Sequence, residues 1–232
     1  MTTKIPKRIA STVLNSLKGG VVPRVGLPYV AVGREAEIDA LLHDVDIIAD
    51  GGATFRFIVG KYGSGKSFLL QTIRNYAMDR NFVVVDADLS PERRLQGSHG
   101  QGLATYKELI RNMSTKTRPG TEAFAQRVEM RIHEVVGTLS ELVHGFDFAQ
   151  LLVMYYRAYV NDDEDTKAKV VKWFRGEYAN KTEARNELGI RIIISDDDWY
   201  EYIKLFASFL VQAGYAGLLV LIDELVNIYK VP

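Results

Sequence analysis

The chain has 232 residues, and its 29 Lys plus Arg balance 29 Asp plus Glu, so no overall positive field favours nucleic acid. Any DNA contact must be local or shared among subunits. The absence of cysteine excludes disulfides and thiolate zinc sites. The N-terminus lacks a signal-peptide apolar run and no stretch approaches the roughly 18 apolar residues of a membrane span, so we expect a cytoplasmic protein without a membrane partner.

Two helices are predicted before the first motif. Residues 6–17 have amphipathic spacing and are followed by Gly19 and Gly20, which end helices well. After a turn-rich stretch, a second helix opens at Gly33-Arg34-Glu35 and continues to about Ile48.

A complete phosphate-binding loop follows. Residues 54–59 are a short β-rich run, the Walker A pattern occupies residues 60–67, and residues 67–78 have helical apolar spacing. Glycine-rich backbone can point successive N–H groups at a phosphate, and the helix that begins there adds its positive end. Lys66 is expected to reach the β and γ phosphates, and the Ser67 hydroxyl to coordinate Mg²⁺. The predicted nucleotide contacts are Gly60, Lys61, Tyr62, Gly63, Ser64, Gly65, Lys66, Ser67 and Phe68.

The segment that opens the second helix also resembles a known arrangement. Gly33-Arg34-Glu35-Ala36-Glu37-Ile38, followed by Leu41-Leu42, is similar to the segment that precedes the loop in AAA+ relatives and in signal-transduction ATPases with numerous domains. The resemblance implies that Val32 and Gly33 contact adenine. A plain capped helix is the alternative.

A second strand is predicted over residues 81–88, and a polar, glycine-rich loop over residues 89–102 follows it. This loop is either a solvated connection, or it places Arg93 or Arg94 on a phosphate, a neighbouring subunit or nucleic acid. Sequence leaves these alternatives open.

Residues 103–215 are expected to form a helical insertion, because they far exceed the length of a strand crossover. Helical spacing is clear at residues 124–136 and 149–160, and the second of these should be buried. The acidic runs 161–165 and 196–198 are interpreted as helix starts rather than metal sites. The aromatic residues Tyr155, Tyr156, Tyr159, Trp173 and Phe174 are interpreted as core rather than base-stacking platforms.

A Walker B pattern appears near the end of the chain. The apolar run Leu218 to Ile222 predicts a buried parallel strand, whose C-terminal end faces the ligand in open α/β sheets. Asp223 is expected to hold Mg²⁺ through its water shell. Resemblance to P-loop ATPases with an acid after that aspartate implies that Glu224 polarises the attacking water. The alternative is that both acids cap the helix predicted at residues 225–230.

Several further segments resemble the ATP-binding proteins of bacteriophage-exclusion (BREX) defence systems, and the likeness spans the chain. They are residues 86–95, 100–106, 114–119, 213–215, 218–224 and 226–230. The resemblance implies an AAA+-like P-loop NTPase, an α/β fold whose parallel sheet carries a large helical insertion between the second strand and the Walker B strand. It also implies ATP as ligand and defence proteins as partners around phage DNA, with a homo-oligomer as a further expectation.

The expected organisation is one nucleotide-binding domain. Its parts are the N-terminal helices (1–50), the first half of the P-loop core (51–102), the insertion (103–215) and the Walker B strand with its helix (216–232). Because no sensor strand, arginine finger or lid follows Glu224, we expect the chain to be the N-terminal part of a longer ATPase. This part is expected to be deficient in hydrolysis, and the gap in its sheet to be filled by another element, by the insertion or by a second chain.

Two classes of function remain. The first is an ATP-hydrolysing motor, and the second is a nucleotide-gated scaffold that binds ATP with little or no hydrolysis. A kinase would need an acceptor site and a lid that the sequence does not show. No Asn-Lys-x-Asp motif is present, which favours ATP over GTP.

Overall fold

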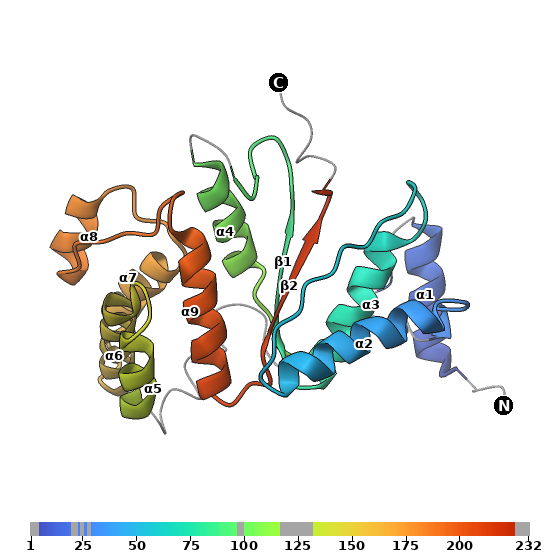
Figure 1. Ribbon diagram of the computed structural model, residues 1–232, viewed down its shortest axis with the longest axis horizontal. Helices are drawn as coiled ribbons and strands as arrows, with labels where there is room; N and C mark the ends of the chain where they lie inside the picture. Colours follow the sequence, from blue (N-terminus) through green and yellow to red (C-terminus); the bar gives the residue numbers. More distant parts are fainter. Residues whose placement is uncertain are drawn as a thin grey trace. The chain divides into compact units, whose positions relative to one another are not determined.

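The computed structural model describes residues 5–19, 23, 26, 29–96, 100–116 and 132–225 (Figure 1). Its contacts divide the chain into two units, Met1–Arg80 and Asn81–Pro232, and we describe each unit by itself. Among the described helices, none has both the length and the apolar character needed to cross a membrane.

The described residues of the first unit form three helices, all predicted from the sequence. They are α1 (Lys7–Lys18), α2 (Glu35–Ala49) and α3 (Lys66–Asp79). Helices α2 and α3 contact each other, and each contributes buried apolar side chains, including Val45 from α2 and Leu69 and Ile73 from α3. This packing holds the start of α3, where the phosphate-binding loop ends.

The run that leads into the loop is not a strand, contrary to the prediction for residues 54–59. Phe55, Phe57 and Val59 are 81%, 65% and 92% exposed. Strand geometry is stabilised by a ladder of hydrogen bonds to a neighbour, and no described residue forms one with this run. Its anchor is instead an ion pair between the Arg56 guanidinium and the Asp44 carboxylate on α2. Arg56, through its hydrogen bond, holds the pKa of Asp44 below its usual value.

The second unit is built on a parallel pair of strands, which confirms the α/β class (Figure 1). Strands β1 (Val83–Asp88) and β2 (Leu218–Asp223) were both predicted, and they pair in register from Val83 with Leu218 to Asp88 with Asp223. The expected burial of β2 is wrong for most of the strand, because only Leu221 is buried and Val220 is exposed. An antiparallel bridge between Val84 and Ser114 lies beside β1. In the described chain, β2 therefore pairs with β1.

Helices cover this sheet in layers. Helices α4 and α9 contact β1 and β2 respectively, and α5 to α8 lie beyond α9 (Figure 1). The helices of this unit are α4 (Gln101–Arg111), α5 (Ile132–Ser140), α6 (Gly145–Val160), α7 (Glu164–Phe174), α8 (Lys181–Leu188) and α9 (Trp199–Gln212). Of the helix predicted at residues 124–136, residues 124–131 lie outside the described part.

The core between these helices is rich in aromatic rings. Phe148 packs edge-on against Phe174 and Phe206, with ring centroids 5.0 and 5.1 Å apart. Trp173 is fully buried and its Nε1–H donates to the carbonyl of Ile192 at 2.9 Å. The interpretation of Trp173 and Phe174 as core residues is therefore confirmed.

Helix α6 is partly buried, with exposed side chains near its start and in its last turn. Tyr155 and Tyr156 pack partly against the core, whereas Tyr159 and Val160 are exposed. The prediction that residues 149–160 are buried is thus wrong for Gln150 and for the last turn, which is followed by the solvent-exposed turn that leads to α7.

The two acidic runs serve helix starts, as predicted, although one serves an unexpected helix. Asp163 accepts the backbone N–H of Thr166 at 3.0 Å and so caps α7. Asp196 accepts the N–H of Leu103 at 2.7 Å and also that of Gly100. Its charge therefore stabilises the start of α4, while Asp198 of the same run is the N-cap residue of α9.

Candidate functional site

The loop at residues 60–67 bends sharply at two glycines. Gly63 and Gly65 have φ of +77° and +82°, a left-handed backbone that residues with a side chain adopt at a cost. Between them, the N–H of Ser64 donates to the carbonyl of Lys61 at 3.1 Å. The chain then enters α3 at Lys66. The first N–H groups of a helix have no acceptor within it, so the loop ends in donors suited to an anion.

The loop closes tightly on itself, and its lysine lies against its first residues. A Cβ on Gly60 would lie 2.5 Å from the Ser64 hydroxyl, so only glycine allows this approach without a shift of Ser64. Lys66 Nζ donates to the carbonyls of Gly60 and Lys61, both at 3.1 Å. A cation and a helix N-terminus thus meet at one small loop, and this arrangement fits a phosphate group.

An arginine that the sequence reasoning missed connects the loop to the segment before α2. The Arg34 guanidinium donates to the carbonyl of Ser64, and its Nη1 lies 3.3 Å from the Glu37 carboxylate. A Cβ on Gly65 would lie 3.0 Å from Arg34 Nη2. Gly33 and Val32 immediately precede Arg34 in the chain. The Gly-Arg-Glu motif contained this residue, but only the fold shows what it contacts.

The two residues predicted to contact adenine differ in their surroundings. Gly33 has a φ of +74°, and its N–H donates to Glu35 Oε1 at 3.4 Å. Val32 is 85% exposed. An exposed apolar side chain is available to a flat aromatic base. Adenine contact by Val32 and Gly33 stays a prediction.

In the second unit, the predicted acids lie at the C-terminal end of β2. Asp223 is the last residue of the strand, and its carbonyl accepts the N–H of Leu89 at 3.1 Å. Glu224 is exposed and has a left-handed φ of +56°, and its N–H donates to Asp223 Oδ1 at 2.8 Å. Such a backbone is uncommon for a residue with a long side chain, and strained residues of this kind cluster at functional sites.

A second carboxylate lies beside Asp223. The register pairs Asp88 with Asp223, so the last residues of both strands are acids. Burial and the charge of Asp223 raise the pKa of Asp88 above its usual value, whereas nearby Arg93 acts in the opposite direction. Asp88 was not singled out from the sequence, although the strand visibly ends in Asp-Ala-Asp, because the pairing of the two strands is a tertiary property.

Within the described residues, no three His, Asp or Glu side chains are grouped as a metal site. Mg²⁺ is typically held by one or two carboxylates together with phosphates and waters, so a cluster of three protein ligands is not required. The oxygen donors of Asp223 and Ser67 are of the chemical type that Mg²⁺ prefers.

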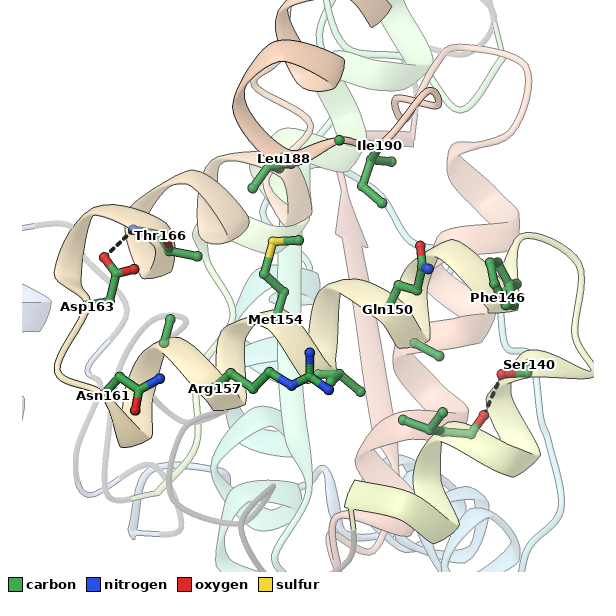
Figure 2. A pocket seen from close by; sticks show the side chains of 15 residues that line it. Ser140, Phe146, Gln150, Met154, Arg157, Asn161, Asp163, Thr166, Leu188 and Ile190 are labelled. Atoms are coloured by element: carbon green, nitrogen blue, oxygen red, sulfur yellow. Dashed lines mark hydrogen bonds between the residues drawn. The ribbon is translucent and has the colours of Figure 1, made fainter.

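A separate hollow of about 550 Å³ lies among helices α5 to α8. Figure 2 shows Gln150, Met154 and Arg157 along α6, with Leu188 and Ile190 on the facing segment. Its size is ordinary for a ligand pocket. None of the predicted nucleotide or metal residues lines it.

Comparison with known proteins gives one family. The family described as "BREX system ATP-binding protein BrxC/D" matches residues 5–126 and 116–232. No curated protein and no solved structure matches the chain. Because the family match covers nearly the whole chain, the protein belongs to the BREX system ATP-binding family BrxC/D.

Proposed function

We propose that this protein is a P-loop ATPase module of AAA+-like fold that acts with partner proteins in anti-phage defence. The observation that supports this most strongly is the loop at residues 60–67, where two left-handed glycines, the Lys66 ammonium and the start of α3 come together. Membership of an ATP-binding family identifies the expected anion as the phosphates of ATP.

The loop backbone would bind the phosphates through its N–H groups, and Lys66 would move from its loop carbonyls onto the β and γ phosphates. Ser67 and Asp223 would hold Mg²⁺, which supplies charge neutralisation between the phosphates when bound. Val32 and Gly33 would receive the adenine.

Hydrolysis would depend on Glu224. Its carboxylate would orient a water and accept a proton from it while the water oxygen bonds to the γ-phosphorus. The bond between that phosphorus and the β–γ bridging oxygen breaks, which yields ADP and phosphate. The hydrogen bond from the Glu224 N–H to Asp223 couples the positions of the two acids.

A nucleotide-gated scaffold is the second candidate, and one observation favours it. Phe55, Phe57 and Val59 are exposed immediately before the loop. Exposed apolar residues grouped in this way are typical of surfaces that bind other proteins. A scaffold would use ATP to order this segment and would hydrolyse it slowly.

Glu224→Gln separates the two candidates, because it removes the proton acceptor and keeps the shape of the side chain. We expect an ATPase to retain ATP binding and lose turnover by a factor of about 10² to 10⁴. Lys66→Ala is the binding control and should lose both. If wild type binds Mg²⁺-ATP but its turnover rate is no higher than that of Glu224→Gln, the result supports the scaffold and contradicts the ATPase.

A further inference from the structure

One peptide unit of the phosphate loop is held by a side chain from outside the loop. The Arg34 guanidinium, at the start of α2, donates to the carbonyl of Ser64. That carbonyl and the N–H of Gly65 belong to the same peptide unit. Because a trans peptide is planar, its C=O and its N–H point in opposite directions. Arg34 therefore also fixes the direction of the Gly65 N–H, which points away from the arginine.

The N–H of Gly65 has no acceptor within the described chain. The Gly65 carbonyl, by contrast, accepts the N–H of Leu69 at 3.0 Å and so belongs to the first turn of α3. An N–H that immediately precedes a helix adds one donor to those of the first turn, which also lack acceptors within the helix. Such a donor is suited to a phosphate oxygen.

Glycine makes this peptide unit easy to turn over. Gly65 has a φ of +82°, and a residue without a Cβ adopts both signs of φ at little cost. Rotation of the peptide would exchange the positions of the Ser64 carbonyl and the Gly65 N–H. A carbonyl oxygen directed at a phosphate would repel it. The hydrogen bond from Arg34 opposes this rotation, because the rotation would break it.

Arg34 is itself held by α2. Its Nη1 lies 3.3 Å from the Glu37 carboxylate, and its carbonyl accepts the N–H of Ile38 at 3.0 Å. Helix α2 contacts α3, and a second arginine joins the same two helices through Arg80 Nη1 and Asp46 Oδ1, 2.7 Å apart. Arg80 follows the last residue of α3, at the opposite end from the loop. It therefore provides a matched comparison for Arg34.

We propose that Arg34 is a positioning residue of the phosphate loop, which holds the peptide between Ser64 and Gly65 so that the Gly65 N–H donates to a phosphate of the bound nucleotide. This inference rests on the proposed nucleotide site and adds a residue that sets its affinity. All the residues involved lie within the first unit. Because Arg34 acts through the loop, its effect should be the same for any ligand whose phosphates occupy the loop, whatever the base.

The test measures the affinities of the full chain for ATP, ADP and inorganic pyrophosphate in the presence of Mg²⁺, with pyrophosphate measured by competition against ATP. Arg34→Gln should weaken all three by a similar factor of about five or more, the expected effect of losing one charge-assisted hydrogen bond from a partly exposed arginine. Arg34→Lys keeps a cationic donor and should recover most of the lost affinity. Arg80→Gln removes the contact at the other end of α3 and should change none of the three affinities.

Each other outcome contradicts the inference. A loss for ATP alone would place Arg34 on the terminal phosphate, and losses for ATP and ADP without one for pyrophosphate would place it on the base or ribose. Equal losses in Arg34→Gln and Arg80→Gln, with lower melting temperatures in both, would mean that Arg34 only stabilises the pair of helices. Unchanged affinities in Arg34→Gln, no recovery in Arg34→Lys, or no competition by pyrophosphate in wild type would remove the role given to the arginine.

Failure of the proposed function is separately visible. Wild type and Lys66→Ala would then bind ATP equally or not at all, and both proposals would fall. If Lys66→Ala loses ATP affinity and Arg34→Gln does not, the nucleotide site stands and only the positioning role of Arg34 is refuted.

Discussion

The two left-handed glycines of the phosphate loop allow a quantitative test of its geometry. Gly65→Ala places a methyl group at φ +82° and 3.0 Å from Arg34 Nη2. The backbone cost of a left-handed residue with a Cβ is about 1–2 kcal/mol, which corresponds to a loss of affinity of about 5- to 30-fold if the loop must adopt this shape to bind ATP. Displacement of Arg34 from the Ser64 carbonyl adds to that cost.

Gly63→Ala is the matched comparison, since Gly63 has a similar φ of +77° but no atom within 4 Å of its added Cβ. Gly63→Ala should lose affinity through the backbone cost alone. ATP affinity should therefore decrease from wild type to Gly63→Ala and again to Gly65→Ala. Isothermal titration calorimetry with Mg²⁺-ATP measures all three. Affinity of Gly65→Ala equal to that of wild type would refute the account of the loop, and equal losses in both variants would refute the role given to Arg34.

The remaining predictions concern the second unit. Gly145→Ala would place a Cβ 1.7 Å from the Leu139 carbonyl oxygen, so it should destabilise the protein by about 2–3 kcal/mol and visibly lower the melting temperature; an unchanged melting temperature would contradict the tight turn into α6. Tyr106→Phe removes a buried hydroxyl that donates to the Phe174 carbonyl at 2.6 Å, and urea unfolding should show a loss of about 1–3 kcal/mol. Capping of α7 lowers the pKa of Asp163 below its ordinary 3.8. The ionised carboxylate therefore stabilises the folded protein above that pH, and this stabilisation disappears as the pH falls through the folded-state pKa. The difference in melting temperature between wild type and Asp163→Ala should therefore be constant from pH 7 to pH 5 and shrink below pH 3.8, whereas a constant difference throughout would show that the charge is irrelevant.

Local pattern was sufficient for most individual elements. The continuous apolar runs predicted β1 and β2, and apolar spacing predicted α1, α2, α3 and most of α6. A helix with one buried face has apolar residues at regular spacing, and a short continuous apolar run is typical of a strand. Acidic runs before α7 and α9 were correctly interpreted as local structure.

The errors arose where structure depends on distant partners. Residues 54–59 have the composition of a strand, but a strand also needs a neighbour to pair with, and no described residue provides one. The contact of the Asp196 carboxylate with the start of α4, which lies far away in the sequence, was not predicted. Neither partner can be found from propensity.

The candidate site divides in the same way. The loop motif identified Lys66 and its glycines because the chemistry is contained in a few consecutive residues. Arg34 and Asp88 were missed as site residues, since one acts through a contact with Ser64 and the other through the register with Asp223. Each is visible only when separate segments are brought side by side.

The most direct test of the central claim is a calorimetric titration of Mg²⁺-ATP into the full chain and into Lys66→Ala. The account predicts saturable binding to wild type and a weakening of about tenfold to a hundredfold in the variant, the expected effect of removing one charge-assisted phosphate contact. Equal binding by the two proteins, or no binding by either, would contradict it.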